Sequence, residues 1–160
     1  MKKVNIQTTV SIFEATQTLP KPDQDLLTLA TEALEDAYAP YSHFLVGAAV
    51  LLANGKMIKG SNMENAAYPM CLCAERAAIA AATSSYPGIP IVAIGITVKH
   101  QGKTIEKPAA PCGSCRQVLF EVENRFGQTI KILLRGQEGP VYVLESAKAL
   151  LPLSFDGSFL

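Results

Sequence analysis

The sequence predicts an α/β domain in which helices cover both faces of a mixed β-sheet. Two features indicate this fold class. Phe44 to Leu52 and Lys56 to Gly60 flank Asn54-Gly55, the strongest short-range signal for a hairpin of two antiparallel strands. Helical and strand-like segments then alternate to the end of the chain, as expected when helices pack on both sides of a sheet.

Four stretches have the apolar spacing or the composition of helices. They cover about 24–38, 73–82, 113–124 and 145–151. The first ends before Pro40 and the last before Pro152, because proline cannot continue a helix.

Three further strands follow the hairpin. They are expected at 91–98, 130–134 and 141–144. The run from Ile91 to Val98 is rich in β-branched residues and follows the breakers Pro87-Gly88 and Pro90, which is typical of a buried strand. With the hairpin, these strands give a predicted sheet of five.

The chain is interpreted as one domain with an N-terminal extension. Residues 1–22 are assigned to the extension because Pro20 and Pro22 disfavour a regular element there. Residues 23–160 contain no repeat, low-complexity tract or linker that would divide them, and their length suits a single core.

Charge and hydropathy narrow the expected partners. Fourteen Lys and Arg balance fourteen Asp and Glu, so no overall field attracts a nucleic acid polymer or an anionic membrane. The apolar runs are shorter than the roughly 18 to 20 residues that span a bilayer, and Met1 to Ile6 leads into polar sequence. We therefore expect a cytoplasmic protein that binds a small molecule.

The four cysteines form two close pairs, which suits metal or redox chemistry better than a disulfide framework. Pro111-Cys112-Gly113-Ser114-Cys115 places two thiols three residues apart where a helix is expected to begin. The positive end of the helix dipole there favours thiolates. By itself this pair is compatible with zinc binding, with redox activity or with simple packing.

A second predicted helix start, Cys73-Ala74-Glu75, favours zinc. A structural zinc site takes four protein ligands, whereas three cysteines beside an acid leave the fourth position to water, as in a catalytic site. Cys71 has the wrong spacing to Glu75 for this pattern and is interpreted as a small buried apolar residue. A four-cysteine structural site that includes Cys71 is the rival interpretation.

These motifs resemble the zinc deaminase signature H-x-E…P-C-x-x-C in its three-cysteine form. The chain is similar to the small homotetrameric cytidine deaminases over about residues 24–155. Four segments carry the resemblance, in the same order: Ala39-Pro40-Tyr41-Ser42-His43-Phe44-Leu45-Val46-Gly47-Ala48-Ala49, Asn62-Met63-Glu64-Asn65-Ala66-Ala67-Tyr68-Pro69, Cys73-Ala74-Glu75-Arg76 and Cys115-Arg116-Gln117-Val118-Leu119. The chain departs from the family in its N-terminal extension, in Leu45 where proline is common, and in its last five residues.

The resemblance implies a three-layer α/β/α sandwich with a mixed five-stranded sheet, and a catalytic domain over residues 23–160. It implies one Zn²⁺ per chain, held by Cys73, Cys112 and Cys115. The implied reaction is hydrolytic deamination of cytidine and 2′-deoxycytidine, a step of pyrimidine salvage that releases ammonia. Zinc-bound hydroxide would attack the ring while Glu75 moves the protons.

The same resemblance implies a nucleoside-binding set. Asn62 and Glu64 would bind the ribose hydroxyls, and Phe44 would pack against the base. The backbone of Ala74 and the side chain of Glu75 would recognise the edge of the pyrimidine.

Three more residues are expected to act around this set. Tyr68 and Phe155 would reach the active site of a neighbouring subunit in a homotetramer. Three thiolates on Zn²⁺ carry a formal charge of −1, and hydrogen bonds from Arg76 to the sulfurs would offset it. His43 and His100 are interpreted as ordinary surface or turn residues.

Several other functions are compatible with parts of the pattern. A deaminase for a modified or antibiotic nucleoside would share the metal chemistry. A structural zinc-binding module would leave Glu75, Asn62 and Glu64 without a role, and a thiol oxidoreductase would use only Cys112 and Cys115. A polynucleotide deaminase needs a basic, aromatic channel, which zero net charge and the lack of Trp disfavour.

Overall fold

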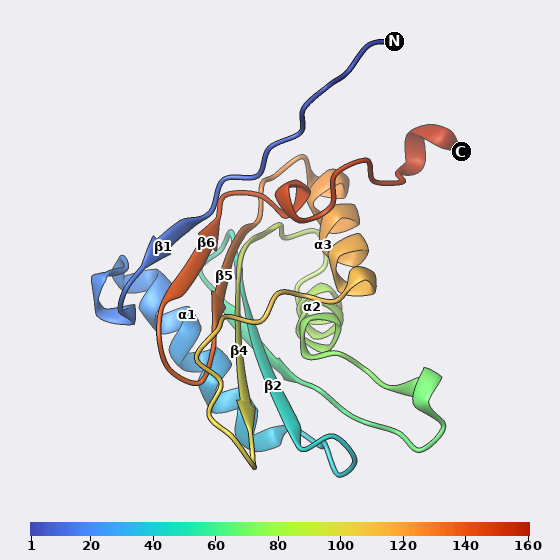
Figure 1. Cartoon of the computed structure of the whole chain (residues 1–160). Coiled ribbons are helices and arrows are strands. Elements are labelled where there is room, and N and C mark those ends of the chain that lie inside the picture. The colour runs from blue at the N-terminus through green and yellow to red at the C-terminus, as the bar shows by residue number, and fades with distance from the viewer.

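The computed structural model, which describes residues 1–160, is built around a six-stranded sheet with the order β1-β6-β5-β4-β2-β3 (Figure 1). The strands are β1 Ser11–Phe13, β2 Phe44–Leu52, β3 Met57–Ser61, β4 Ile91–His100, β5 Lys131–Arg135 and β6 Val141–Leu144. Strands β4 and β5 run parallel, and every other neighbouring pair is antiparallel. The sheet is therefore mixed, as predicted, and the hairpin is β2–β3.

Helices cover both faces of this sheet and confirm the three-layer sandwich. They are α1 Lys21–Glu32, α2 Ala74–Ser85 and α3 Gly113–Phe126. Helix α1 lies on one face, and α2 and α3 lie together on the other (Figure 1). The closing helix is shorter than predicted, a single 3₁₀ turn at Ala147–Leu150 called η4 below. None of the helices has both the length and the apolar character needed to cross a bilayer.

Strand β5 shows why the central strands are almost wholly apolar. Ile132 and Leu134 belong to the core cluster between the sheet and α2 and α3. Leu133, which points to the other face, belongs to the cluster beneath α1. All three side chains are buried, so this strand has no polar face.

The prediction of five strands was wrong by one, because Ser11–Phe13 adds β1 to the edge of β6. Three residues are too few to show a strand period, so the sequence gives little signal for this pairing. The expectation that Pro20 and Pro22 disfavour a regular element was also wrong. Helix α1 begins at Lys21 with Pro22 in its first turn, where an N–H has no partner within the helix in any case.

Gly47 marks the closest approach between α1 and the sheet. A Cβ atom on Gly47 would lie 2.0 Å from the carbonyl oxygen of Ala30 and 3.1 Å from the backbone nitrogen of Leu34. Both neighbours are backbone atoms and cannot rotate away, so any side chain here would push α1 off β2.

We expect Gly47→Ala to lower the free energy of unfolding by about 3 kcal/mol, the upper end of the usual cost of overpacking. Urea denaturation measures this loss. Gly157→Ala is the matched control, because a Cβ there meets nothing within 4 Å. Equal urea midpoints of unfolding for the two variants would contradict the close packing of α1 on β2.

Candidate metal centre

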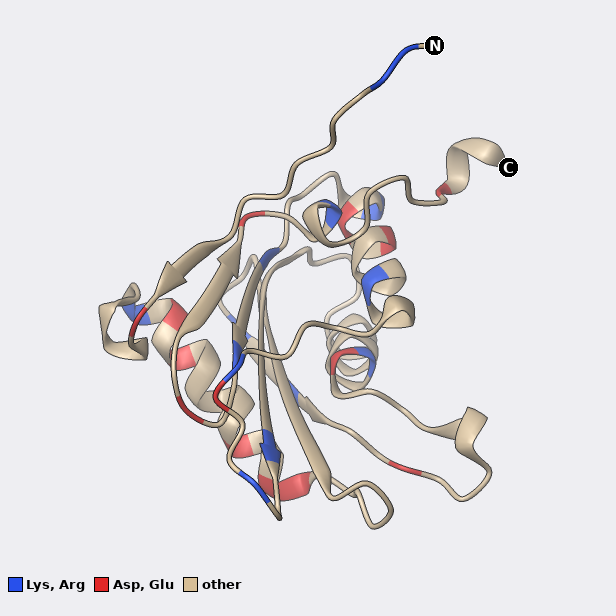
Figure 2. Ribbon diagram, in the orientation of Figure 1, with Lys and Arg blue, Asp and Glu red and all other residues tan.

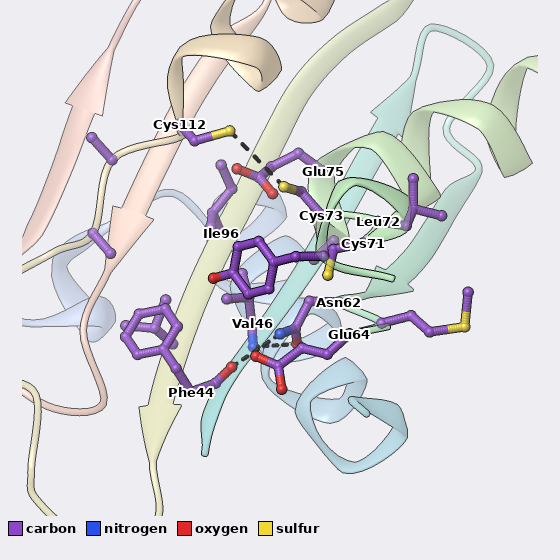
Figure 3. Close-up of a pocket in the computed structure, with 16 residues that line it drawn as sticks. Phe44, Val46, Asn62, Glu64, Cys71, Leu72, Cys73, Glu75, Ile96 and Cys112 are labelled. Carbon is purple, nitrogen blue, oxygen red and sulfur yellow. Dashed lines mark hydrogen bonds between the residues drawn. The ribbon is translucent and has the colours of Figure 1, made fainter. Parts of the chain in front are cut away.

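A cavity of about 420 Å³ opens beside Cys73 and Cys112, on the face of the sheet that carries α2 and α3 (Figure 3). Thirteen of its 16 lining residues are hydrophobic, among them Val46 of β2 and Ile96 of β4. The few polar groups converge from separate segments. An apolar cavity with a few converging polar groups is the usual form of a small-molecule site.

The three predicted metal ligands meet where α2 and α3 begin. Cys73 is the N-cap residue of α2, and Cys112 is the N-cap residue of α3. Cys115 lies one turn into α3 and is fully buried. Both helix N-termini therefore direct unpaired N–H groups and the positive ends of their dipoles toward the sulfurs, which favours thiolates.

The spacing of the sulfurs suits a zinc ion. Sγ of Cys112 lies 3.5 Å from Sγ of Cys115 and 3.9 Å from Sγ of Cys73. All three sulfurs lie within 4.8 Å of one another. A tetrahedral site with Zn–S bonds of ~2.3 Å separates its sulfurs by about 3.8 Å. The trio thus fits one Zn²⁺ per chain, and three thiolates leave one of the four positions open.

Interactions within the trio shift the pKa values of its sulfurs in opposite directions. Hydrogen bonding from Cys115, followed by that from Cys112 and Arg76, lowers the pKa of Cys73 to about 5. The reciprocal interaction with Cys73, together with burial, raises the pKa of Cys115. Of the two, Cys73 is the sulfur whose thiolate form is favoured, and binding a cation would displace the remaining thiol protons.

Arg76 lies beside this charge. Its Nη2 donates to the carbonyl of Cys71 at 3.1 Å, while its Nε is buried without a partner. Burial by itself lowers the pKa of Arg76, but the interactions with Cys73, Cys115 and Cys112 together outweigh it, so the pKa is raised. A buried N–H without an acceptor is rare, and a full set of thiolates would supply negative charge next to it.

Glu75 is the buried acid of the cavity, with 5% of its surface exposed. Burial raises its pKa above the usual value, and the charge on Cys73 adds to the effect. Figure 3 shows its carboxylate beside the sulfurs of Cys73 and Cys112. A carboxyl group whose pKa is raised holds a proton more readily than an exposed one, as suits a group that must accept and donate protons.

Asn62 and Glu64 lie at the other end of the cavity (Figure 3), where the backbone of the 41–46 segment already engages them. Asn62 Oδ1 accepts a hydrogen bond from the N–H of Val46 at 2.8 Å, and Nδ2 donates to the carbonyl of Phe44 at 2.9 Å. Glu64 Oε2 accepts from two consecutive backbone N–H groups, those of Tyr41 and Ser42. No local pattern indicates these contacts, which join residues 16 to 23 positions apart.

The remaining predicted residues separate into two groups. Phe44, Ala74 and Tyr68 line the cavity, although the Tyr68 side chain is 74% exposed at its rim. Phe155 does not line it; its ring stacks on Phe159 with centroids 5.5 Å apart, and it is 57% exposed.

Residues that sequence reasoning missed form much of the apolar wall. Ile96 and Val98 come from β4, and Ala109 and Ala110 come from the segment that precedes α3. Because side chains alternate between the two faces of a strand, Ile96 and Val98 are expected on the same face of β4. Nothing in the sequence indicates that this face borders a cavity.

A family model described as the cytidine and deoxycytidylate deaminase zinc-binding region matches residues 20–127. The cytidine deaminases of Halalkalibacterium halodurans and Sporosarcina psychrophila are each 38% identical to this chain, over 82% of it and over 92% and 90% of their own lengths. The crystal structure of cytidine deaminase from Burkholderia pseudomallei superposes with a TM-score of 0.71 at 41% identity, covering 82% of this chain and 97% of that one. The crystal structure of cytidine deaminase from Mycobacterium tuberculosis superposes with a TM-score of 0.63 at 33% identity, covering 82% of this chain and 95% of that one.

We expect Cys71→Ser to keep one zinc per chain. The Cys71 sulfur lies outside the trio and accepts a hydrogen bond from the backbone N–H of Asn65 at 3.3 Å, a contact that a serine hydroxyl can replace. Metal analysis after dialysis measures the content, with Cys112→Ser as the variant that should lose zinc. Equal loss from both variants would support the four-cysteine site instead.

Proposed function

Because the chain belongs to the cytidine and deoxycytidylate deaminase family, we propose that it hydrolyses cytidine and 2′-deoxycytidine to uridine and 2′-deoxyuridine, with release of ammonia. The observation that carries this proposal is the meeting of three cysteine sulfurs and a buried carboxyl group in one apolar cavity. Zinc, when bound by Cys73, Cys112 and Cys115, would supply the Lewis acidity that makes a water molecule reactive near neutral pH.

Glu75 moves the protons of the reaction. Its carboxylate accepts a proton from the attacking water as the new C–O bond forms at carbon 4, and delivers it to ring nitrogen 3. It then takes the proton of the new hydroxyl group and gives it to the amino group, so that the C–N bond breaks and ammonia leaves. The carboxylate ends as it began. Its burial in the cavity supports this role, because it keeps the proton within the site.

The nucleoside spans the cavity from the sulfurs to Asn62 and Glu64. Each of these two side chains retains capacity for a sugar hydroxyl: one N–H on Asn62 Nδ2, and Oε1 of Glu64. Their backbone contacts hold them in place before substrate arrives. Phe44 supplies an apolar surface for the base, and the Ala74 backbone lies next to Glu75 at the pyrimidine edge.

The charges of the site favour an uncharged substrate. The lining of the cavity includes no lysine or arginine that would pair with a phosphate. Figure 2 shows Lys and Arg scattered over the molecule rather than gathered along one surface. A free nucleoside of pyrimidine salvage in the cytoplasm suits this arrangement better than a polynucleotide.

Arg76 balances the charge of the centre. Three thiolates and Zn²⁺ sum to −1, which weakens the metal as a Lewis acid. The guanidinium group beside Cys73 has a buried Nε without an acceptor, so it can hydrogen-bond to the sulfurs and withdraw charge from them.

The active sites are shared in a homotetramer. Tyr68 and Phe155 are large and exposed, as expected of side chains that complete the site of a neighbouring subunit. On the outer side of α2, Ala80 and Ala81 are exposed, and such small residues allow another helix to approach closely. Both features support an interface formed by copies of this chain.

The decisive test of the activity is the loss of ultraviolet absorbance when the purified protein meets cytidine or 2′-deoxycytidine, followed together with ammonia release. Activity with one zinc per chain supports the proposal. A zinc-loaded protein that deaminates neither nucleoside would exclude it and would favour a modified nucleoside as substrate or a structural metal site.

We expect Glu75→Gln to lose deamination by roughly 10²-fold to 10⁴-fold, because the amide keeps the shape but cannot carry a proton. Zinc content should not change, since Glu75 is not among the sulfur ligands. Turnover and metal content are measured on the same sample. Retention of more than about a tenth of wild-type turnover would contradict the proton-shuttle role, since such groups usually raise the rate at least ~10²-fold.

Glu64→Ala should impair deamination of cytidine far more than any residual activity on free cytosine. A site built to bind a hydroxyl group loses selectivity for it when the protein partner is removed. Comparing kcat/KM for the two substrates tests the sugar contact. Equal damage to both would show that Glu64 serves only the Tyr41 and Ser42 backbone.

Truncation before Ser154 should abolish most of the activity and leave zinc in place, because it removes Phe155 without touching a sulfur ligand. Light scattering on the full chain should show a tetramer. A fully active monomer near 17.1 kDa, or a truncated protein with full activity, would rule out shared sites.

A further inference from the structure

We propose that Arg116 is a positioning residue: it holds the backbone next to Cys112, one of the zinc ligands, against the C-terminal segment of the chain. Nε of Arg116 donates to the carbonyl of Pro111 at 2.8 Å, and Nη1 donates to the carbonyl of Leu150 at 3.2 Å. One guanidinium group thus joins the residue before a zinc ligand to a segment more than thirty positions further along the chain.

Cys112 needs such a support more than the other ligands do. Cys115 is buried within α3 and Cys73 is partly buried, whereas Cys112 is exposed and so has the least protein around it. The segment between β4 and α3 that leads to Cys112 contains no helix or strand of its own. The carbonyl of Pro111 belongs to the same peptide plane as the nitrogen and the Cα atom of Cys112, so a bond to that oxygen restrains the backbone from which the cysteine side chain extends.

The other end of the link is itself anchored. Leu150 ends η4, and the buried carboxylate of Glu123 on α3 accepts hydrogen bonds from the backbone N–H and the hydroxyl group at the start of that turn, those of Ala147 and Ser146. Glu123 is only 2% exposed. Arg116 therefore connects Pro111 to a fixed point and not to a fraying terminus.

The role inferred for Arg116 is geometric and not electrostatic. Arg116 directs its donors to two neutral carbonyl groups, while Arg76 is the arginine that interacts with the Cys73 sulfur. A lysine at position 116 would keep the positive charge, but its single ammonium group lacks the planar fork that reaches both carbonyls at once.

The inference rests on the zinc centre of the proposed function, and zinc release tests it without an activity assay. Full-length zinc-loaded protein is mixed with excess chelator, and the rate of zinc loss is followed. We expect Arg116→Gln and Arg116→Lys both to release zinc roughly 10-fold to 100-fold faster, the usual effect of removing a group that orients a metal ligand. The absorption spectrum of the cobalt-substituted protein should change in both.

Two matched controls lie on the same helix. Arg125→Gln removes an arginine that packs over the Phe126 ring at 5.2 Å, at the far end of α3. Gln117→Ala removes a hydrogen bond to the carbonyl of Phe155 but none to Pro111. Both should release zinc at the wild-type rate.

The outcomes separate this inference from the proposed function. A wild-type protein that binds no zinc overturns both. If the wild type binds zinc and both Arg116 variants release it at the wild-type rate, only the positioning role is overturned. The same holds if Arg116→Lys releases zinc at the wild-type rate while Arg116→Gln releases it faster. If Arg116→Gln fails to fold, Arg116→Lys decides alone, because it keeps the charge and the aliphatic stem.

Discussion

The structure depends on the meeting of two helix N-termini at one point above the sheet. Cys73 and Cys112 are 39 positions apart in sequence, yet their sulfurs lie 3.9 Å apart. This requires α2 to lie very close to the hairpin, and the backbone shows how. A Cβ on Gly60 of β3 would be 2.4 Å from the backbone nitrogen of Ala78, so only glycine at this position lets the helix lie where it does. Gly60 thus helps to set the position of the metal ligands.

The chemistry follows from what surrounds that point. Thiolates gain from two helix dipoles and from Arg76, whereas Glu75 loses its hydration and is pushed toward its protonated form. The same apolar walls that raise the pKa of Glu75 also strengthen electrostatic interactions within the cavity. One enclosure therefore stabilises negative charge on the sulfurs and makes the neighbouring acid a reversible proton carrier.

Local sequence patterns predict much of the fold and of the metal centre, whereas contacts between residues distant in sequence could not be predicted. The hairpin and the sulfur trio were predicted because each depends on residues close in sequence or at the starts of helices. Strand β1 was missed because three residues are too few to show the alternation of a strand. The backbone contacts of Asn62 and Glu64 were missed because their partners are distant in sequence and follow no local pattern. In the single chain, Phe155 lies outside the cavity, and a sequence cannot say where a second chain would bring it.

The short strand β1 has a practical consequence for handling the protein. It covers the edge of β6, whose Val-Tyr-Val-Leu sequence combines high strand propensity with no charge. At the opposite edge, β3 carries Lys59, which pairs with Asp36 at 2.7 Å and discourages strand addition. A shortened version beginning at α1 would keep every residue of the cavity and uncover the unprotected backbone of β6. Such a version would invite edge-to-edge aggregation, even though it removes only residues remote from the chemistry.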